Sequence, residues 1–311
     1  MHHTHTHAPL SATALRYSLA ATFAYVLITL FAGIRAHSLA LLSEAGHNVT
    51  DLLALLLSWV AVYIQTRPPS ATKTFGYHRA GVLAAFVNAL TLVVIAFYIF
   101  YEAAVRMRNP VSVQPKIMIW VAVIGVIMNG VIAWVLFRAA RDVNMRSAFV
   151  HQFGDTISTA AVIVGGWAIM LTGRTWIDPA LSIGIGCLIL WSSFGIIRET
   201  LNILLEGAPQ GLTAENISAL LSQIEGIRDV HDVHVWSLGS DTHALSCHIR
   251  IDDTTLSESQ IILRQVTEVL ATTCHIDHTT IQLENVNCEI AHGCVIPIAA
   301  GRTPEFLKIR R

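Results

Sequence analysis

The chain has 311 residues, of which 53% are hydrophobic and only 13% are charged, and its mean hydropathy is +0.56. Soluble domains carry about 25% charged residues, so this composition excludes an ordinary soluble enzyme and a disordered protein. Residues 1–206 have 13 Lys and Arg against 8 Asp and Glu, a net charge of +5, whereas residues 207–311 have 7 against 13, a net charge of −6. Neither part has the basic excess that is typical of nucleic-acid binding, so we expect no nucleic acid as a partner.

The first two thirds of the chain contain six apolar stretches that are long enough to cross a bilayer, which takes about 20 helical residues. We expect these spans at residues 15–34, 38–64, 80–104, 115–137, 147–172 and 179–198. Six spans place both termini on one side, and eight Lys and Arg lie in the loops and flanks of that side against five on the other. Because cytoplasmic loops are enriched in basic residues, this favours cytoplasmic termini. We therefore expect a His-rich cytoplasmic tail over residues 1–13 and a transmembrane domain over residues 14–205, embedded in the lipid bilayer.

After residue 205 the pattern becomes that of a small soluble domain. Helices are expected at residues 213–224 and 257–272, and strands at residues 230–238, 243–251 and 279–284. The order α-β-β-α-β suits a compact α+β domain with its helices on one face of a small sheet. We expect this domain over residues 206–287, with a C-terminal tail over residues 288–311. About 80 residues is small for an independent core, so docking to a second copy would help to stabilise the domain.

Two spans each carry a histidine and an aspartate four residues apart, His47 with Asp51 and His151 with Asp155. Positions i and i+4 share one face of a helix. If the two faces meet, they offer two nitrogens and two oxygens, a suitable shell for tetrahedral Zn²⁺. A single intramembrane His or Asp could simply pair with a neighbouring helix, but an ionised Asp costs about 2.5–3.5 kcal/mol at the bilayer centre. Two such pairs therefore favour a metal site.

Glu44 lies on the same face of the second span as His47 and Asp51, one turn nearer the outer end. The sequence leaves two interpretations open for this residue. It lines an entrance to the site, or it is a surface glutamate that extends to the membrane interface.

The two HxxxD motifs, together with FGYHR at residues 75–79 and LLEGAP at residues 204–209, resemble the cation diffusion facilitator family, and more closely its bacterial cobalt–zinc–cadmium efflux branch. The resemblance covers about residues 15–284. It implies a homodimeric, proton-coupled antiporter of the cytoplasmic (inner) membrane that exports divalent metal from the cytoplasm, with a ferredoxin-like second domain. It also implies that the ligands of the transported ion are His47, Asp51, His151 and Asp155, with a preference for zinc over cadmium and manganese.

The chemistry of the donor atoms supports zinc independently. Two nitrogens and two oxygens in a tetrahedron suit Zn²⁺, whereas Mn²⁺ and Mg²⁺ favour oxygen-rich octahedra, and Co²⁺ and Cd²⁺ are kept as further candidate substrates. Ligation requires neutral histidine and ionised aspartate, so protons compete with the metal. We expect histidine, which titrates near neutral pH, to carry the proton.

The resemblance implies two further sets of residues. Arg79 falls where the family has a basic residue that pairs with an acid after the sixth span, here Glu206, and this pair would lock the membrane and soluble parts together. An interfacial Arg that faces lipid headgroups is an equal alternative. In the soluble domain, His231 and His248 fall where some relatives place regulatory zinc ligands, and Glu284 lies near a third. Histidines on adjacent strands also occur as ordinary surface residues.

We interpret the chain as a secondary transporter that exports Zn²⁺ in exchange for protons, with zinc as its substrate and as a regulatory ligand. An intramembrane zinc enzyme is one alternative, but it needs an open position for water and a general base, typically within HExxH, and the sequence has no HExxH. We therefore expect no enzymatic activity. A membrane metal sensor that reports zinc without transport is the other alternative.

Overall fold

The computed structural model describes residues 12–139, 143–240 and 242–285, apart from the side chains of residues 12–21, 55, 58, 135–136, 138–139, 143–148 and 151. Residues 1–11 of the expected His-rich tail and the whole expected C-terminal tail, 288–311, lie outside the described residues. The described residues form two compact units, one within residues 12–70 and 80–201 and one within residues 71–79 and 202–285.

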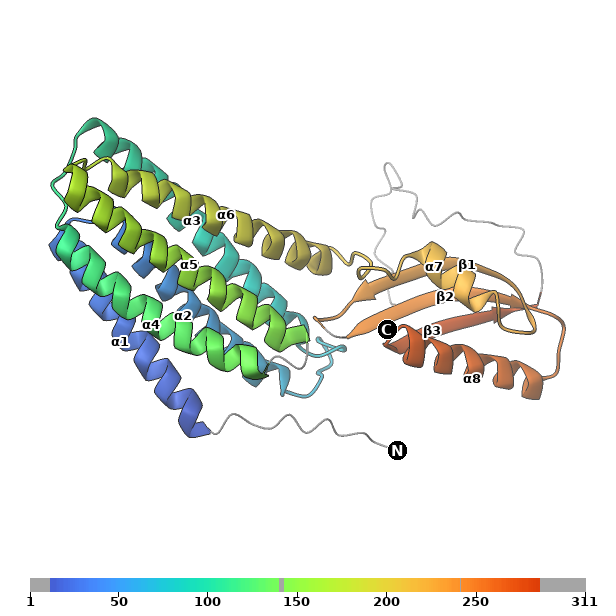
Figure 1. Ribbon diagram of the computed structural model, residues 1–311. Coiled ribbons are helices and arrows are strands. Elements are labelled where there is room, and N and C mark those ends of the chain that lie inside the picture. The colour runs from blue at the N-terminus through green and yellow to red at the C-terminus, as the bar shows by residue number, and fades with distance from the viewer. Residues whose placement is uncertain (1–11, 140–142, 241, 286–311) are drawn as a thin grey trace, which may run out of the picture. The chain divides into compact units, whose positions relative to one another are not determined.

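The first unit is a bundle of long helices that lie side by side (Figure 1). They are α1 (Ala12–Ala36), α2 (Leu39–Gln65), α3 (Arg79–Arg108), α4 (Pro115–Ala139), α5 (Val143–Thr172) and α6 (Ile177–Leu204). Each covers one of the expected apolar stretches. Five of them, α2 to α6, contain a segment long and apolar enough to cross a membrane, whereas α1 is described with side chains only over the apolar residues Thr22–Ala36.

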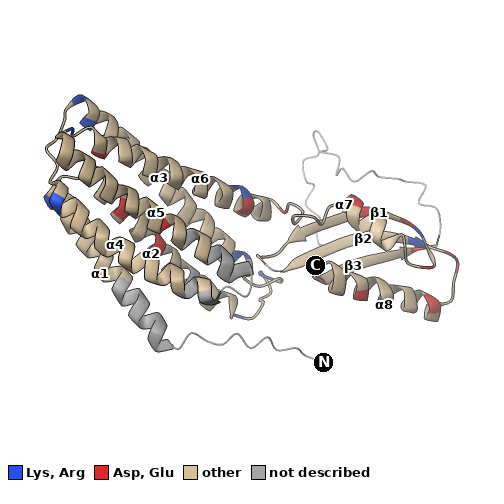
Figure 2. Cartoon of the chain, viewed as in Figure 1, with Lys and Arg blue, Asp and Glu red and all other residues tan. Residues whose placement is uncertain are grey.

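Large apolar side chains cover the outside of the bundle and small ones fill much of its inside. Trp120, Leu171 and Trp191 are strongly exposed, as expected for a surface that faces lipid. Buried alanines, such as Ala40, Ala96 and Ala122, let the helices approach closely. Figure 2 shows that charged residues gather at the helix ends, apart from a few acidic positions inside the bundle. Those inner acids are the part of the bundle that apolar packing does not explain.

The second unit is the expected small α+β domain. Its elements are α7 (Ala214–Leu221), β1 (Ile227–Ser237), β2 (His243–Ile251), α8 (Leu256–Thr273) and β3 (Ile276–Glu284). β2 lies in the middle of the sheet, antiparallel to β1 and parallel to β3. A ferredoxin-like fold has the order βαββαβ. The described residues have the order αββαβ, with no strand before α7, so the ferredoxin-like fold stays a prediction.

Both helices of this unit pack on one face of the sheet. Leu245, Cys247 and Ile249 alternate along β2 and share one buried cluster with Ile217 of α7 and Val266 of α8. Because successive strand residues point to opposite faces, the residues between them, including His248, lie on the face without helices. This face carries the polar cluster described below.

Candidate metal centres

The first candidate centre lies between α2 and α5. α2 is a regular helix across its HxxxD motif, so His47 and Asp51 project from one face, and Asp155 projects from α5. The described ligand atoms of His47, Asp51 and Asp155 lie within 4.8 Å of one another. His151 lies in α5, four residues before Asp155, but its side chain is outside the described part of the chain.

The spacing of these atoms suits a small cation. Nε2 of His47 is 3.0 Å from Oδ1 of Asp155 and 3.7 Å from Oδ2 of Asp51. Tetrahedral zinc with bonds of about 2.0–2.2 Å needs ligand atoms about 3.3–3.6 Å apart. The side chains of His47 and Asp155 are each 12% exposed and that of Asp51 is 30% exposed. The group is thus largely buried, with Asp51 as its most accessible member.

Glu44 is one turn before His47 and is not a surface residue. It is only 1% exposed, and Oε1 lies 2.6 Å from the hydroxyl oxygen of Thr159 on α5. The interpretation of Glu44 as a surface glutamate is therefore wrong, because neighbouring helices cover this part of α2.

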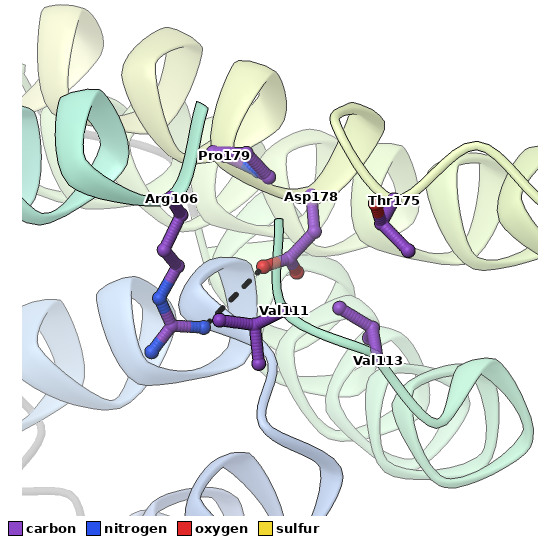
Figure 3. A pocket seen from close by; sticks show the side chains of 6 residues that line it. All are labelled: Arg106, Val111, Val113, Thr175, Asp178 and Pro179. Atoms are coloured by element: carbon purple, nitrogen blue, oxygen red, sulfur yellow. Dashed lines mark ion pairs between the residues drawn. The ribbon is translucent and has the colours of Figure 1, made fainter. Parts of the chain in front are cut away.

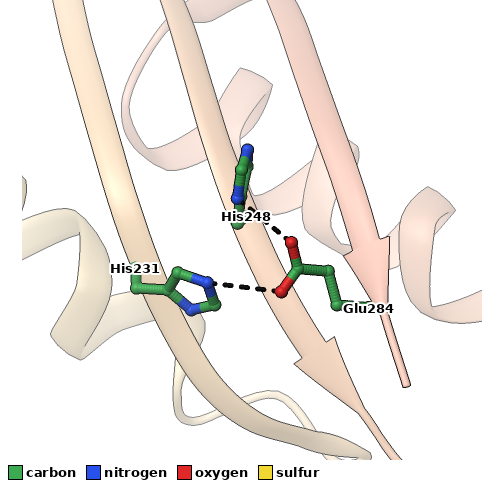
Figure 4. Close-up of side chains that lie close together, drawn as sticks. All are labelled: His231, His248 and Glu284. Atoms are coloured by element: carbon green, nitrogen blue, oxygen red, sulfur yellow. Dashed lines mark ion pairs between the residues drawn. The ribbon is translucent and has the colours of Figure 1, made fainter. Parts of the chain in front are cut away.

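The second candidate centre lies on the open face of the sheet, where each of the three strands contributes one side chain (Figure 4). His231 on β1 is directly opposite His248 on β2. Glu284 on β3 is opposite Arg250, two residues along β2 from His248. The Glu284 carboxylate faces both rings, with Oε1 at 3.1 Å from Nδ1 of His248 and Oε2 at 3.4 Å from Nε2 of His231. These separations also suit the edges of a zinc tetrahedron.

An aspartate lies beside the far nitrogen of each histidine. Oδ2 of Asp229 is 3.0 Å from Nδ1 of His231, and Oδ2 of Asp232 is 3.7 Å from Nε2 of His248. Asp232 occupies an irregular position of β1, between His231 and His234, with a φ of 51°. Metal-binding histidines commonly hydrogen-bond a carboxylate through their other nitrogen, which sets the ring orientation. Asp229 makes this contact with His231, whereas Asp232 hydrogen-bonds His234 at 3.1 Å.

Two atoms of this cluster are buried without a hydrogen bond. Nε2 of His231 and Oε2 of Glu284 have no hydrogen-bond partner among the described residues. Buried polar atoms are normally paired, so each such atom calls for an explanation. A cation bound between His231, His248 and Glu284 would satisfy both, and the residues present therefore fit a metal ion.

Cys247 lies on the same strand as His248 but does not belong to this centre. It is on the opposite face of β2, in the core, where burial raises the pKa of its thiol to about 11. Only a thiolate is a good metal ligand, so Cys247 is a core residue here.

Arg79 and Glu206 lie together in the second unit. Nη2 of Arg79 is 3.2 Å from Oε1 of Glu206, and both side chains are partly or largely exposed. In the same unit, the rings of Phe75 and His278 meet edge to face with centroids 5.1 Å apart. The segment 71–79 thus packs with the residues that follow the last long helix. Of the two interpretations of Arg79, this geometry fits the ion pair.

Asp178 is a buried acidic residue that we did not predict from the sequence (Figure 3). It is the second residue of α6 and is fully buried, and it accepts hydrogen bonds from the Ser38 hydroxyl at 2.5 Å and from the backbone N–H of Leu39 at 2.6 Å. A carboxylate at this position satisfies the free N–H groups at the start of α2 and complements its dipole. Arg106 of α3 is 4.0 Å away. Two features of the sequence could have indicated this contact. One is the aspartate in the first turn of α6, and the other is Ser38, which directly precedes α2.

Comparisons with known proteins agree with this architecture. Residues 15–205 match the family model of the cation efflux transmembrane domain, and residues 209–286 match that of the cation efflux protein cytoplasmic domain. The chain is 36% identical to the cadmium, cobalt and zinc/H(+)-K(+) antiporter of Bacillus subtilis, over 84% of this chain and 85% of the relative. It is also 36% identical to the zinc transporter ZitB of Escherichia coli, over 94% and 93%, and 33% identical to the metal cation efflux system protein CzcD of Cupriavidus metallidurans, over 93% and 92%.

Two family models therefore cover nearly the whole chain, in the order in which the two units occur. The relatives match over almost their full length, so the likeness is not confined to one unit. With acidic and histidine side chains gathered inside a bundle of membrane-length helices, this chain belongs to the cation diffusion facilitator family, in its bacterial cobalt–zinc–cadmium efflux branch.

Proposed function

We propose that this protein is a secondary transporter that exports Zn²⁺ from the cytoplasm across the inner membrane in exchange for protons, with His47, Asp51, His151 and Asp155 as ligands of the transported ion. The observation that carries the proposal is the convergence of His47, Asp51 and Asp155 between two helices of membrane-spanning length. Acids are expensive in a bilayer interior and mark ion pathways there.

The contact between His47 and Asp155 suggests how protons compete with the metal. Without metal, a proton on Nε2 of His47 is shared with Oδ1 of Asp155 at 3.0 Å. Metal binding needs the same nitrogen lone pair, and the proton must leave first. One pair of atoms thus binds either a proton or a metal ion, which is the requirement for exchange.

The donor set supports zinc as the main substrate. Nitrogen and carboxylate ligands at tetrahedral spacing favour Zn²⁺ and accept Co²⁺, whereas Mn²⁺ and Mg²⁺ prefer octahedral oxygen sites. The names of the relatives include zinc, cobalt and cadmium. We include Co²⁺ and Cd²⁺ as secondary substrates.

The membrane arrangement that we propose has six spans, with α1 as the first and both termini in the cytoplasm. α1 has 25 residues, which at 1.5 Å per residue gives about 37 Å, enough for a bilayer core of about 30 Å. With this topology, α2 begins at the outer side, and the second unit, ferredoxin-like in its last five elements, lies in the cytoplasm.

The second unit is proposed to form a homodimer and to bind regulatory zinc through His231, His248 and Glu284. Two copies of a segment with a net charge of −6 repel each other, and bound Zn²⁺ reduces this repulsion. The Arg79–Glu206 pair lies where the chain enters α3 and leaves α6, and we propose that it transmits this change to the transport helices.

Zinc flux into proteoliposomes, with and without an imposed pH gradient, tests the proposal. An exchanger moves zinc faster when the gradient drives protons the opposite way, and Asp155→Asn removes this flux. A sensor or an intramembrane enzyme would bind zinc without flux under either condition. Flux that ignores the pH gradient would contradict the exchange of zinc for protons.

A further inference from the structure

A buried polar cluster surrounds Glu44, one helical turn away from the candidate metal site. Its members are Tyr25 of α1, Glu44 of α2, Asn129 of α4 and Thr159 of α5, and all four are buried. We call this set the Glu44 cluster. None of its members is one of the four proposed ligands, so metal binding does not explain why they are polar.

The Glu44 cluster is packed tightly around one hydroxyl group, that of Thr159. Oγ1 of Thr159 lies 2.6 Å from Oε1 of Glu44, and Nδ2 of Asn129 lies 3.5 Å from the same hydroxyl. Gly125 of α4 makes room beside it, because a Cβ there would overlap the Tyr25 hydroxyl and lie 2.9 Å from Cγ2 of Thr159. The Tyr25 hydroxyl thus lies near the methyl group of Thr159, and it has no hydrogen-bond partner among the described residues.

The number of hydrogens in this arrangement indicates that Glu44 is protonated. Oγ1 of Thr159 is 2.8 Å from the backbone carbonyl oxygen of Asp155 as well as 2.6 Å from Glu44. A Thr hydroxyl has one hydrogen and can donate to only one of these two oxygens. If Glu44 carries a proton, it donates to Thr159, Thr159 donates to the Asp155 carbonyl, and both short contacts are hydrogen bonds.

Among the described residues, no Lys or Arg lies beside Glu44 to balance a carboxylate. No Lys or Arg among the described residues forms an ion pair with Glu44, and Oε2 of Glu44 has no hydrogen-bond partner there. The titratable groups near it are Tyr25 on α1, His47 on its own helix and Asp155 on α5. α4 contributes the neutral Asn129, and α3 contributes the apolar Ile95 beside Gly46. An ionised carboxylate in such a place is costly, so the neutral acid is favoured.

We propose that Glu44 is a second proton-binding site of the exchange cycle, distinct from the metal ligands. It holds a proton while the metal site is empty. When Zn²⁺ occupies the site one turn away, its charge favours the carboxylate, Thr159 turns its hydrogen from the Asp155 carbonyl to Glu44, and the proton leaves to solvent. Zinc and the neutral acid thus give bound zinc, the carboxylate and one released proton. This inference rests on the proposed exchange of zinc for protons.

The position of the Glu44 cluster suits this role. Glu44 is in the second turn of α2 and Thr159 is one turn after Asp155 in α5, so the Glu44 cluster lies on the side of the metal site nearer the start of α2. In the proposed topology that side faces the cell exterior, from which the protons enter. Glu44 would therefore meet an incoming proton before the metal ligands do.

Proton counting on the purified full-length protein tests the proposal. Zinc is added to protein in a weakly buffered solution, and a pH-indicator dye measures the protons released per zinc ion bound. Glu44→Gln keeps the size of the side chain and can still donate a hydrogen bond to Thr159. We expect it to bind zinc within about threefold of the wild type and to release about one proton fewer. Glu199→Gln, at an exposed acid of α6, is the matched control and should release the wild-type number.

Infrared difference spectra of the wild-type protein provide a second measurement that requires no variant. Zinc binding should remove a carbonyl band of a protonated carboxylic acid, and this change should be missing from Glu44→Gln. Equal proton release by the wild type and Glu44→Gln, or the absence of any such band change in the wild type, would overturn the role of Glu44. If instead the wild-type protein moves no zinc in proteoliposomes, the proposed transport function itself fails. Transport with an unchanged proton count in Glu44→Gln refutes only the inference about Glu44.

Discussion

The two candidate centres use the same donor atoms in different surroundings. On α2 and α5, His47, Asp51 and Asp155 lie inside a helix bundle, and histidine and carboxylate contact each other directly. On the sheet, His231 and His248 are about one third exposed, and each has an aspartate beside its far nitrogen. The comparison suggests that the two centres have different roles. We propose that the helical centre loses its ion when protons arrive, whereas the sheet centre, in which Asp229 orients His231, retains its ion.

Removal of a carboxylate from the helical centre should have the largest effect. Asp155→Asn keeps the shape of the side chain but removes the charge that balances both the metal and a proton on His47. We expect zinc flux into proteoliposomes to fall at least about 100-fold, because each coordinate bond in a low-dielectric site is worth several kcal/mol. Asp253→Asn, at an exposed position of the second unit, is the control. Flux near the wild-type rate in Asp155→Asn would exclude this residue as a ligand.

Loss of the carboxylate that caps α2 should destabilise the helix bundle, which contains the helical centre, and leave the sheet centre unchanged. Asp178→Ala leaves the Ser38 hydroxyl and two backbone N–H groups at the start of α2 without their acceptor, and removes one of the two acids near Arg106, the other being Glu102. Removing one partner of a buried charged network costs about 3–5 kcal/mol. We expect a large fall in the midpoint of thermal unfolding in detergent and loss of transport. Zinc affinity of the sheet centre should not change, and a parallel loss there would show that the centres are not independent.

Changes in the aspartates of the sheet test whether they orient metal ligands. Asp229→Asn should weaken zinc binding at the sheet centre by about 10–100-fold, because the carboxylate that holds Nδ1 of His231 is lost. Isothermal titration with zinc measures the affinity, in a background in which Asp155→Asn has removed the helical centre. Asp252→Asn, which disturbs only the exposed pair with Arg228, is the matched control. If both variants bind zinc equally well, His231 is an ordinary surface histidine.

The helical centre should change its metal preference when a nitrogen ligand becomes an oxygen ligand. His47→Asp gives one nitrogen and three oxygens, a harder set that should favour cadmium or manganese relative to zinc by about tenfold. Competition between metals during flux into proteoliposomes measures the ranking. An unchanged ranking would mean that His47 does not determine selectivity.

The sheet centre should also influence transport. Zinc bound by His231, His248 and Glu284 should draw the second units of two copies together. The coupling free energy between the sheet centre and the transport helices should be about 1–3 kcal/mol, a typical value for two coupled sites. Spin labels at Glu268→Cys, an exposed position of α8, report the distance between copies during a zinc titration. The distance should shorten in the wild-type background and stay constant with His231→Ala. A constant distance in both would make the second unit a static clamp.

Much of the fold and part of each centre could be predicted from residue patterns. The α-β-β-α-β order of the second unit is confirmed, because β-branched residues alternate in its strands and Thr213 and Thr255 cap its helices. The joint presence of His47 and Asp51 on one face followed from their spacing alone. Glu44 is different, because helical periodicity places it on that face but says nothing of the helices that cover it.

Local chemistry therefore determined the helices, the strands and the ligand pairs that lie one turn apart, because these depend on neighbours within four residues. Only the tertiary structure decided the contacts between distant segments. It brought Asp155 to His47, aligned His231, His248 and Glu284 across three strands, and buried Asp178 against the start of α2. It also placed one Thr159 hydrogen between two oxygen acceptors, from which the protonation of Glu44 is inferred. Such contacts depend on how whole helices and strands pack, and no local pattern in the chain encodes that packing.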